Sequence, residues 1–131
     1  MKDAPEVRID RLLAEVRAGL PPRPTATELP QLVVEGALIV DIRPLEQRDR
    51  DGELAGALVI DRNVLEWRLD PTSPDRVPGA ADPDRLIIVV CHEGYASSLA
   101  AASLQQLGLG RATDLDGGFQ AVLASRRSDE P

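Results

Sequence analysis

Two continuous apolar runs constrain the fold of this chain more than any other feature. Ala37–Arg43 reads ALIVDIR and Arg85–Val90 reads RLIIVV, and neither alternates apolar with polar residues. A strand that is apolar on both faces is typical of a parallel sheet covered by helices on both sides. Helical segments, Pro44–Leu54 and Ser97–Leu107, follow the two runs, so the sequence predicts an α/β fold.

The rest of the chain continues this alternation. Pro5–Ala18 carries apolar residues at helical spacing, and clustered prolines end that helix. The other expected elements are a short helix capped by Thr27 with Pro30 in its first turn, a strand at Gly56–Asp61, a short helix at Asn63–Leu69, a proline-rich loop at Asp70–Asp84, a glycine cap at Gly108, a strand and turn at Ala112–Gly118 and a helix at Phe119–Arg127.

We therefore expect a short parallel sheet of about four or five strands with helices on both faces. One compact domain is expected at residues 27–127, because 131 residues suit a single hydrophobic core. An N-terminal helix and linker over residues 1–26 precede it in this division. Residues 1–4 and 128–131 are predicted to be loose ends.

Composition excludes several classes of protein. The net charge of −7 argues against a nucleic-acid partner, which would select a basic surface. No apolar stretch approaches the ~20 residues that a membrane helix needs. The first ten residues lack the pattern of a signal peptide, and one cysteine makes no disulfide framework, so we expect a cytoplasmic protein.

That single cysteine, Cys91, directly follows the second apolar run. Gly94 and a helix that starts near Ser97 come next, so a short loop must wrap closely around the sulfur. Ligands of open α/β sheets bind beyond the carboxyl ends of the strands, and amides at a helix start can form a nest for an anion. Such a site favours the thiolate, which is the nucleophilic form. The alternative is that Cys91 is only a small buried apolar residue.

Four motifs in order resemble the rhodanese-like sulfurtransferase domain. Leu38–Pro44 (LIVDIRP) is similar to the family's strand ending in Asp-x-Arg, and Gly52–Ile60 (GELAGALVI) to its Gly-His-x-x-Gly-Ala segment. Val89–Ser98 (VVCHEGYASS) resembles the active-site loop, and Leu115–Phe119 (LDGGF) the turn before the last helix. The resemblance implies that Cys91 accepts a sulfane sulfur and becomes a persulfide.

The resemblance also implies the partners and the residues around the sulfur. A small-molecule or protein persulfide would donate the sulfur, and a thiol would accept it, with no cofactor. The loop residues that would contact the substrate are His92, Glu93, Gly94, Tyr95, Ala96 and Ser97. Their backbone N–H groups would stabilise the anionic persulfide without a side-chain acid or base.

Two departures from the family's pattern bear on which compound could donate the sulfur. Many relatives carry Arg where this chain has Ala96, and the usual histidine of the Gly-His pair is Glu53. Together with Glu93, the missing guanidinium weakens the case for thiosulfate as donor. Arg62 and Arg68 are candidates to replace that cation, and Trp67 is a candidate wall of the pocket. A surface helix with a packed Trp67 and solvated charges is the alternative.

Two other functions remain open from the sequence. A cysteine phosphatase or arsenate reductase has a similar loop but needs an Arg six residues after the cysteine, where this chain has Ser97. A rhodanese-like module could instead serve in binding or in redox sensing. With one His and one Cys, no metal site is expected. We expect Asp41 and Arg43 to form a structural ion pair and Asp116 to lie in a turn.

Overall fold

The two apolar runs form the centre of the sheet, as predicted. The computed structural model of the protein describes residues 5–128. Within it β1 (Leu38–Asp41) and β3 (Ile87–Val90) are parallel neighbours, and β2 (Leu58–Val59) and β4 (Ala112–Asp114) complete a sheet of order β2-β1-β3-β4. All strand pairs are parallel, so the carboxyl ends of the strands share one edge.

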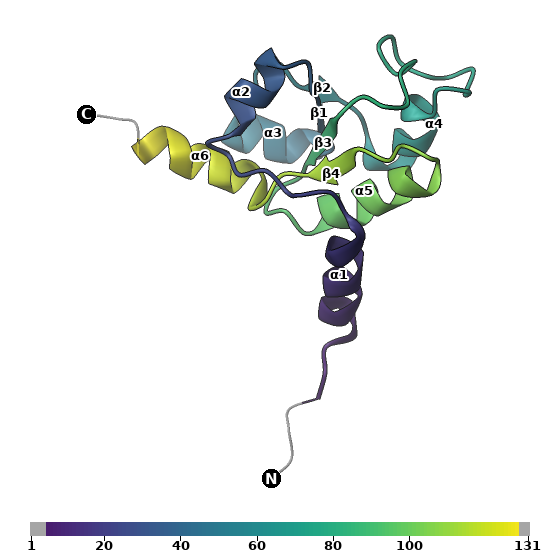
Figure 1. Cartoon of the computed structure of the whole chain (residues 1–131). Helices are drawn as coiled ribbons and strands as arrows, with labels where there is room; N and C mark the ends of the chain where they lie inside the picture. The colour runs from purple at the N-terminus through teal and green to yellow at the C-terminus, as the bar shows by residue number, and fades with distance from the viewer. Residues whose placement is uncertain (1–4, 129–131) are drawn as a thin grey trace.

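Helical segments connect these strands and surround the sheet (Figure 1). The helices are α1 (Arg8–Gly19), α2 (Leu29–Val34), α3 (Leu45–Asp51), the 3₁₀ turn η1 (Arg62–Val64), α4 (Leu65–Leu69), α5 (Ala96–Gln106) and α6 (Gly118–Ser128). The predicted order of elements is therefore confirmed. The predicted strand at Gly56–Asp61 is shorter in the structure, where only Leu58 and Val59 pair with β1.

Successive residues of the central strands point to opposite faces of the sheet. On one face Val40 and Val89 join a core with residues of α4 and α5, and on the other Ile39 and Ile88 join a core with Leu29, Phe119 and Val122. Both cores are built mainly from aliphatic side chains. The prediction that helices cover both faces is confirmed, which explains why the central strands carry apolar residues on both faces of the sheet.

The prediction that Thr27 caps α2 is wrong. The Thr27 hydroxyl bonds to that of Thr25 at 3.0 Å, within the turn that precedes the helix. Thr25 instead donates through its backbone N–H and its hydroxyl to Glu28, at 3.1 and 3.0 Å. The polar groups of Thr25, Thr27 and Glu28 thus bond to one another in the turn before α2, and none of them caps the helix, which begins at Leu29. Pro30 lies in the first turn of the helix, as predicted.

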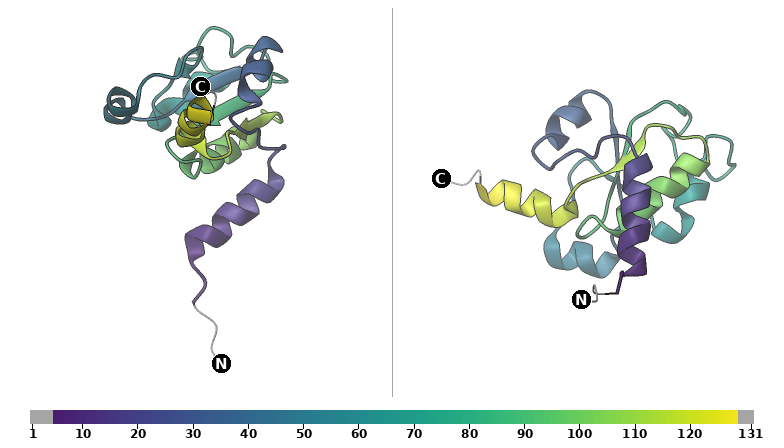
Figure 2. Two further views of the ribbon diagram at one scale, coloured as in Figure 1. Left: turned by 90° about the vertical axis from the view of Figure 1, so that its left-hand side faces the viewer. Right: turned by 60° about the horizontal axis from the view of Figure 1, so that its bottom comes forward.

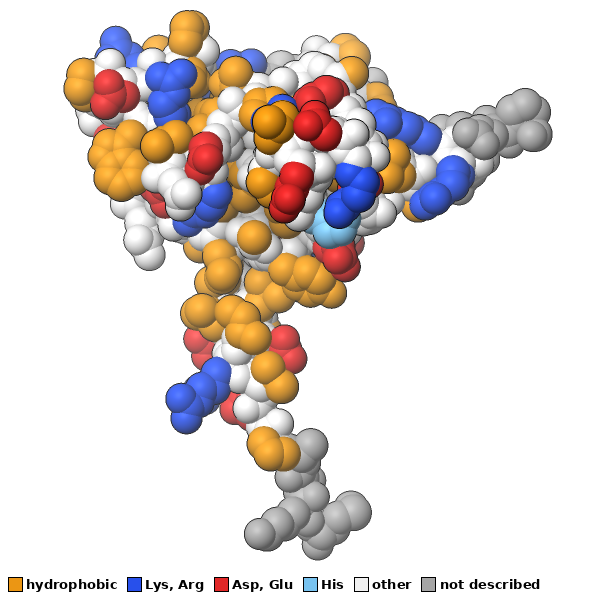
Figure 3. All heavy atoms as spheres, turned by 180° about the vertical axis from the view of Figure 1, so that it is seen from behind, with side chains coloured by type: hydrophobic (Ala, Val, Ile, Leu, Met, Phe, Trp, Pro, Cys, Tyr) orange, Lys and Arg blue, Asp and Glu red, His pale blue; other side chains and the backbone are white. Residues whose placement is uncertain are grey.

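Helix α1 extends away from the sheet (Figures 1 and 2). It contacts α5, and Leu13 is its one buried residue. Val7, just before α1, and Ile9 and Leu12 on it are exposed, and apolar side chains are visible along the helix in Figure 3. No helix in residues 5–128 is both long and apolar enough to cross a membrane. Of the predicted loose ends, residues 1–4 and 129–131 lie outside the described residues, whereas Ser128 is the last residue of α6 and not loose. The domain division remains a prediction.

Candidate active site

Cys91 lies at the carboxyl edge of the sheet, directly after β3. It is 7% exposed, and it lines a cavity of about 280 Å³. The strands β1 and β4 end at the same edge, because all three strands are parallel, so the segments that follow them begin there. Residues from three separate parts of the chain therefore meet around the sulfur.

Two backbone amides point at the sulfur of Cys91. The N–H groups of Gly94 and Ser97 donate to Sγ at 3.1 and 3.3 Å. The thiol itself donates to the Ser97 hydroxyl at 3.1 Å. The structure records no acceptor among residues 5–128 for the N–H groups of Tyr95 and Ala96. The loop therefore offers both occupied and free donors to a negative charge at this position.

Gly94 allows the loop to close this tightly. Its φ is +89°, a conformation that side-chain-bearing residues rarely adopt. The loop also rests on the turn before α6, because a Cβ on Gly118 would lie 2.6 Å from the Cys91 carbonyl oxygen and 2.7 Å from the Gly94 nitrogen. Gly117 also has a positive φ, of +79°. The paired glycines of the LDGGF motif thus make room for the cysteine loop.

The start of α6 orients the first peptides of the loop. The N–H of Phe119 donates to the Cys91 carbonyl at 2.9 Å, and the N–H of Gln120 donates to the His92 carbonyl at 3.1 Å. These bonds hold two loop carbonyls against α6. A trans peptide carries its C=O and N–H on opposite sides, so the amides that follow are directed the other way.

A buried carboxylate lies behind the loop. Asp114, at the end of β4, is fully buried and accepts the Ser97 hydroxyl at 2.7 Å and the Ser98 hydroxyl at 2.8 Å. Arg23 pairs with it through Nε at 2.7 Å. Burial opposes the charge of the guanidinium, but the hydrogen bond and the charge of Asp114, with smaller contributions from Asp116 and Cys91, raise the pKa of Arg23. The buried charges thus form a compensated pair.

Most of the predicted substrate-contacting residues surround the cavity. Those that line it are Arg62, His92, Glu93, Tyr95 and Ala96. Gly94 and Ser97 instead bond to the sulfur directly. Lining residues that sequence reasoning missed are Ile42, Pro44 and Gln47. They follow β1, so their place at the carboxyl edge was a usable signal.

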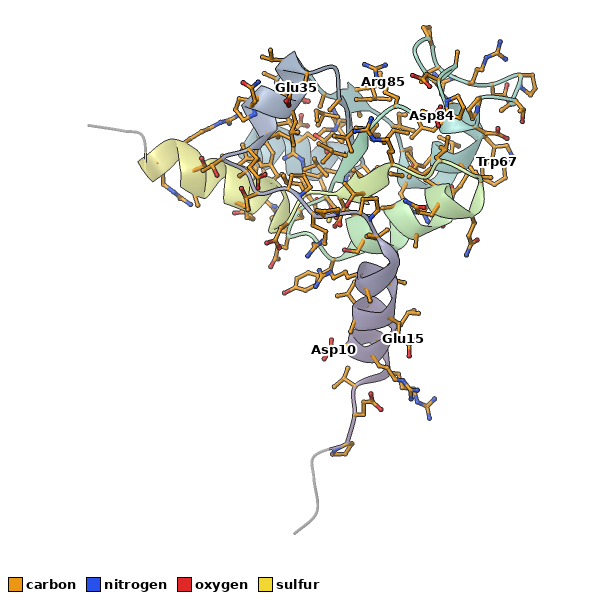
Figure 4. All side chains as sticks on the ribbon, viewed as in Figure 1. Asp10, Glu15, Glu35, Trp67, Asp84 and Arg85 are labelled. Atoms are coloured by element: carbon orange, nitrogen blue, oxygen red, sulfur yellow. The ribbon has the colours of Figure 1, made fainter. Side chains whose placement is uncertain are left out.

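The two candidate replacement cations differ in position. Arg62 lines the cavity but is paired with Glu66, with its Nη1 3.0 Å from both carboxylate oxygens. Arg68 does not line the cavity, because its guanidinium donates to the Asp75 carbonyl at 2.7 Å. The prediction that Trp67 walls the pocket is wrong: its side chain lies on the outer side of α4, 60% exposed (Figure 4).

His92 lies among charged groups at the mouth of the cavity. Its Nδ1 is 3.3 Å from the Gln120 amide and 3.7 Å from the Asp51 carboxylate, and its Nε2 is 3.5 Å from Glu93. A hydrogen bond from Arg50 lowers the pKa of Asp51, although partial burial opposes it, and the charges of Arg50, His92 and Arg43 lower it further. The His92 ring therefore lies between two carboxylates, those of Asp51 and Glu93.

The expected ion pair of Asp41 and Arg43 is confirmed, with both side chains fully buried and 2.9 Å apart. Arg43 also donates to the Gly52 carbonyl and lies 3.7 Å from the centre of the Phe119 ring. It lines the cavity too, although its charge is already compensated. Asp116 lies in the turn before α6, as expected.

Glu53, in place of the family's usual histidine, pairs with Arg48 at 3.2 Å. Residues 5–128 contain no group of three or more His, Cys, Asp or Glu side chains arranged to hold a metal ion.

The family model and the curated relatives agree on one family. The family model of the rhodanese-like domain matches residues 25–125. The thiosulfate sulfurtransferase GlpE of Stutzerimonas stutzeri is 38% identical over 85 residues, which are 65% of this chain and 69% of that protein.

Two solved structures are similar over most of their lengths. A protein of unknown function from Rhodopseudomonas palustris, described as a possible tyrosine phosphatase, is 30% identical with a TM-score of 0.79, over 100% of this chain and 98% of that one. A rhodanese homologue from Thermus thermophilus is 29% identical with a TM-score of 0.55, over 76% and 98%.

Proposed function

We propose, from the premise that this chain belongs to the rhodanese-like domain family, that it is a sulfurtransferase that carries the transferred sulfur on Cys91. The observation that supports this most directly is that Cys91 lines the cavity and that its sulfur accepts hydrogen bonds from the N–H groups of Gly94 and Ser97. Donors preorganised around an anion stabilise it without rearrangement during the reaction.

The reaction consists of two displacements. The Cys91 thiolate attacks the outer sulfur of a thiosulfonate or persulfide, the bond from that sulfur to the donor breaks, and a sulfinate or thiolate leaves with the electron pair. Cys91 then carries a persulfide anion. An acceptor thiolate attacks its outer sulfur and restores the Cys91 thiolate, so no external oxidant or reductant is consumed and the kinetics are ping-pong.

The free amides of Tyr95 and Ala96 are placed to receive the added sulfur. Both residues line the cavity, and neither N–H has an acceptor among the described residues. A terminal persulfide sulfur that projects from Cys91 into the cavity would accept them. The backbone then supplies the compensating charge that no loop side chain offers.

We propose an uncharged organic group on the preferred donor, rather than thiosulfate. Ile42, Pro44, Tyr95 and Ala96 give the cavity apolar surface. The charges of its arginines are already compensated, Arg43 by Asp41 and Arg62 by Glu66, while the buried Arg43 Nη1 has no hydrogen-bond partner among the described residues. An aryl or alkyl chain gains from burial against this surface, whereas a dianion would meet Glu93 without an uncompensated guanidinium charge. A cytoplasmic location suits a reaction that requires a reduced thiol.

A phosphatase reaction has less support in this chain. Ser97 occupies the position where cysteine phosphatases carry arginine, and its hydroxyl donates to the buried Asp114 carboxylate. A phosphate in the loop would therefore meet no guanidinium from α5 and would approach a negative charge.

Intact-mass measurement tests the proposed function. The protein is incubated separately with a benzenethiosulfonate, an alkyl persulfide and thiosulfate, and the Cys91→Ser variant serves as control. We expect the mass of one sulfur atom on the wild type with the first two donors, removable by a thiol, and none on the variant. If no donor adds sulfur, the binding or redox-sensing function takes its place. Phosphate release from an aryl phosphate that requires Cys91 would indicate a phosphatase.

A further inference from the structure

The cysteine loop is also held by a part of the chain that precedes the family match at residue 25. Arg17 belongs to the last turn of α1, and Arg23 to the proline-rich segment that follows α1. That segment runs beside β4, where the Pro24 carbonyl accepts the N–H of Asp116 at 2.9 Å and the Pro21 carbonyl accepts the Thr113 hydroxyl at 3.1 Å. Both arginines are thereby brought behind the active-site loop.

The two arginines converge on one carbonyl of that loop. The Gly94 oxygen accepts Arg17 Nη2 at 2.7 Å and Arg23 Nη2 at 3.1 Å. The same peptide group carries the N–H of Tyr95, which points to the opposite side of the peptide plane. Two charged donors on the oxygen therefore fix the direction of an amide that has no acceptor among the described residues.

The arginines also hold the first turn of α5. Arg17 Nε donates to the Ser98 hydroxyl at 3.0 Å, and Ser98 donates to Asp114. Arg23 pairs with the same carboxylate, which accepts the Ser97 hydroxyl as well. The Ser97 N–H, one of the two donors to the sulfur, is therefore attached to this network through its own side chain.

We propose that Arg17 and Arg23 are positioning residues for Cys91, so that the N-terminal segment forms part of the active site. This role rests on the proposed sulfurtransferase function, because it concerns the amides that would hold the persulfide. The start of α6 holds the carbonyls of Cys91 and His92, and the two arginines hold that of Gly94. The loop is thereby held from both sides.

Arg17→Ala in the full chain tests the proposal first, because it leaves the Arg23–Asp114 pair in place. We expect the single-turnover rate of sulfur uptake at saturating donor to fall about tenfold, while the half-saturating donor concentration changes less than about twofold. The reason is that the amides act on the transferred sulfur and not on the donor's organic group. Alkylation of Cys91 by iodoacetamide at fixed pH should slow in parallel.

Arg85→Ala is the matched control. Arg85 also donates to two backbone carbonyls, those of Gly36 and Gly79, at 3.0 and 3.2 Å, but it precedes β3 at the opposite edge of the sheet (Figure 4). Its loss removes comparable bonds without touching the loop. We expect wild-type sulfur uptake and alkylation rates from this variant, even where its melting temperature falls as far as that of Arg17→Ala.

Arg17→Lys keeps one charged donor for the Gly94 oxygen and should recover most of the rate, which loss of α1 packing alone does not predict. If Arg17→Ala does not fold, the lysine variant is compared with Arg17→Gln, which carries no charge and should remain slow. Equal rates for wild type and the Arg17 variants overturn the proposal. If the wild type takes up no sulfur, the proposed function fails. The positioning role is then judged by alkylation alone: slower alkylation of Cys91 in Arg17→Ala supports it, and a rate equal to that of the wild type overturns it.

Discussion

Ala96 lies where many members of the family carry an arginine, and it lines the cavity above Cys91. We expect Ala96→Arg to raise thiosulfate turnover about tenfold, equivalent to ~1.4 kcal/mol of transition-state binding, because a guanidinium would pair with the dianion. Steady-state kinetics with thiosulfate measure this. Ala96→Gln, which adds length without charge, should change little, and an unchanged rate in Ala96→Arg would show that charge does not limit the use of thiosulfate.

A glycine can be required for its backbone conformation or for the space that its missing Cβ leaves, and a comparison of Gly118 with Gly108 distinguishes the two. In Gly118→Ala the new Cβ would meet the Cys91 carbonyl oxygen at 2.6 Å, so the cysteine loop must move. Gly108 also has a positive φ, of +87°, but a Cβ there meets nothing within 4 Å. Gly108→Ala should lose about 1 kcal/mol of stability through backbone strain, and Gly118→Ala should lose more because its Cβ also meets the cysteine loop; only Gly118→Ala should slow alkylation of Cys91. Equal alkylation rates in the two variants would contradict this assignment.

At the scale of elements, α5 links the site to one of the two cores. Its first turn carries Ser97 and Ser98 behind the sulfur, and Ala100 and Leu104 are fully buried against the sheet. The precise place of the loop therefore depends on how this helix packs. A change in the middle of α5 should affect stability first and the site only through that packing.

We expect Leu104→Ala to lower the free energy of unfolding by about 2–5 kcal/mol, because it leaves a cavity in a closely packed core. Leu107, the residue that caps the end of this helix, is 41% exposed and provides the control. Leu107→Ala should cost less than about 1 kcal/mol. Urea denaturation of both variants measures the difference, and similar losses would mean that α5 is not held through its buried face.

At the scale of the whole molecule, stability is distributed unevenly. The central strands are buried on both sides, whereas the first half of α1 is exposed and extends away from the sheet (Figure 2). Local opening requires less free energy where few apolar contacts must break. Helix α1 is anchored near its end, where Arg17 bonds to Ser98 and Gly94.

We therefore expect the amides of residues 9–12 to exchange with solvent at least about 100-fold faster than those of Ile87–Val90. The last turn of α1 should be protected to an intermediate degree, because of the bonds from Arg17. Hydrogen exchange measured by mass spectrometry distinguishes the three segments. Uniform protection along α1 would show instead that the whole helix belongs to the cooperative core.

The sequence by itself determined the architecture and pointed to Cys91 as the proposed nucleophile. Runs that are apolar at every position, such as Leu86–Val90, specify buried parallel strands, because both faces of such a strand must be covered. The order of strands and helices then brings the segment after β3 to the carboxyl edge. Cys91, Gly94 and the Gly117–Gly118 pair are local signals, since each meets its conformational requirement within a few residues.

Only the tertiary structure decided what surrounds the loop. Arg23 meets Asp114 across 91 positions of sequence and Gly94 across 71, and Arg17 meets Gly94 across 77. The same chain offers other arginines, such as Arg68, which bonds to a nearby carbonyl instead. Which cation reaches the site depends on how α1 and the linker pack beside α5 and β4. The packing of α1 and the linker depends on many contacts between residues far apart in the sequence, so no local pattern of residues predicts which arginine reaches the loop.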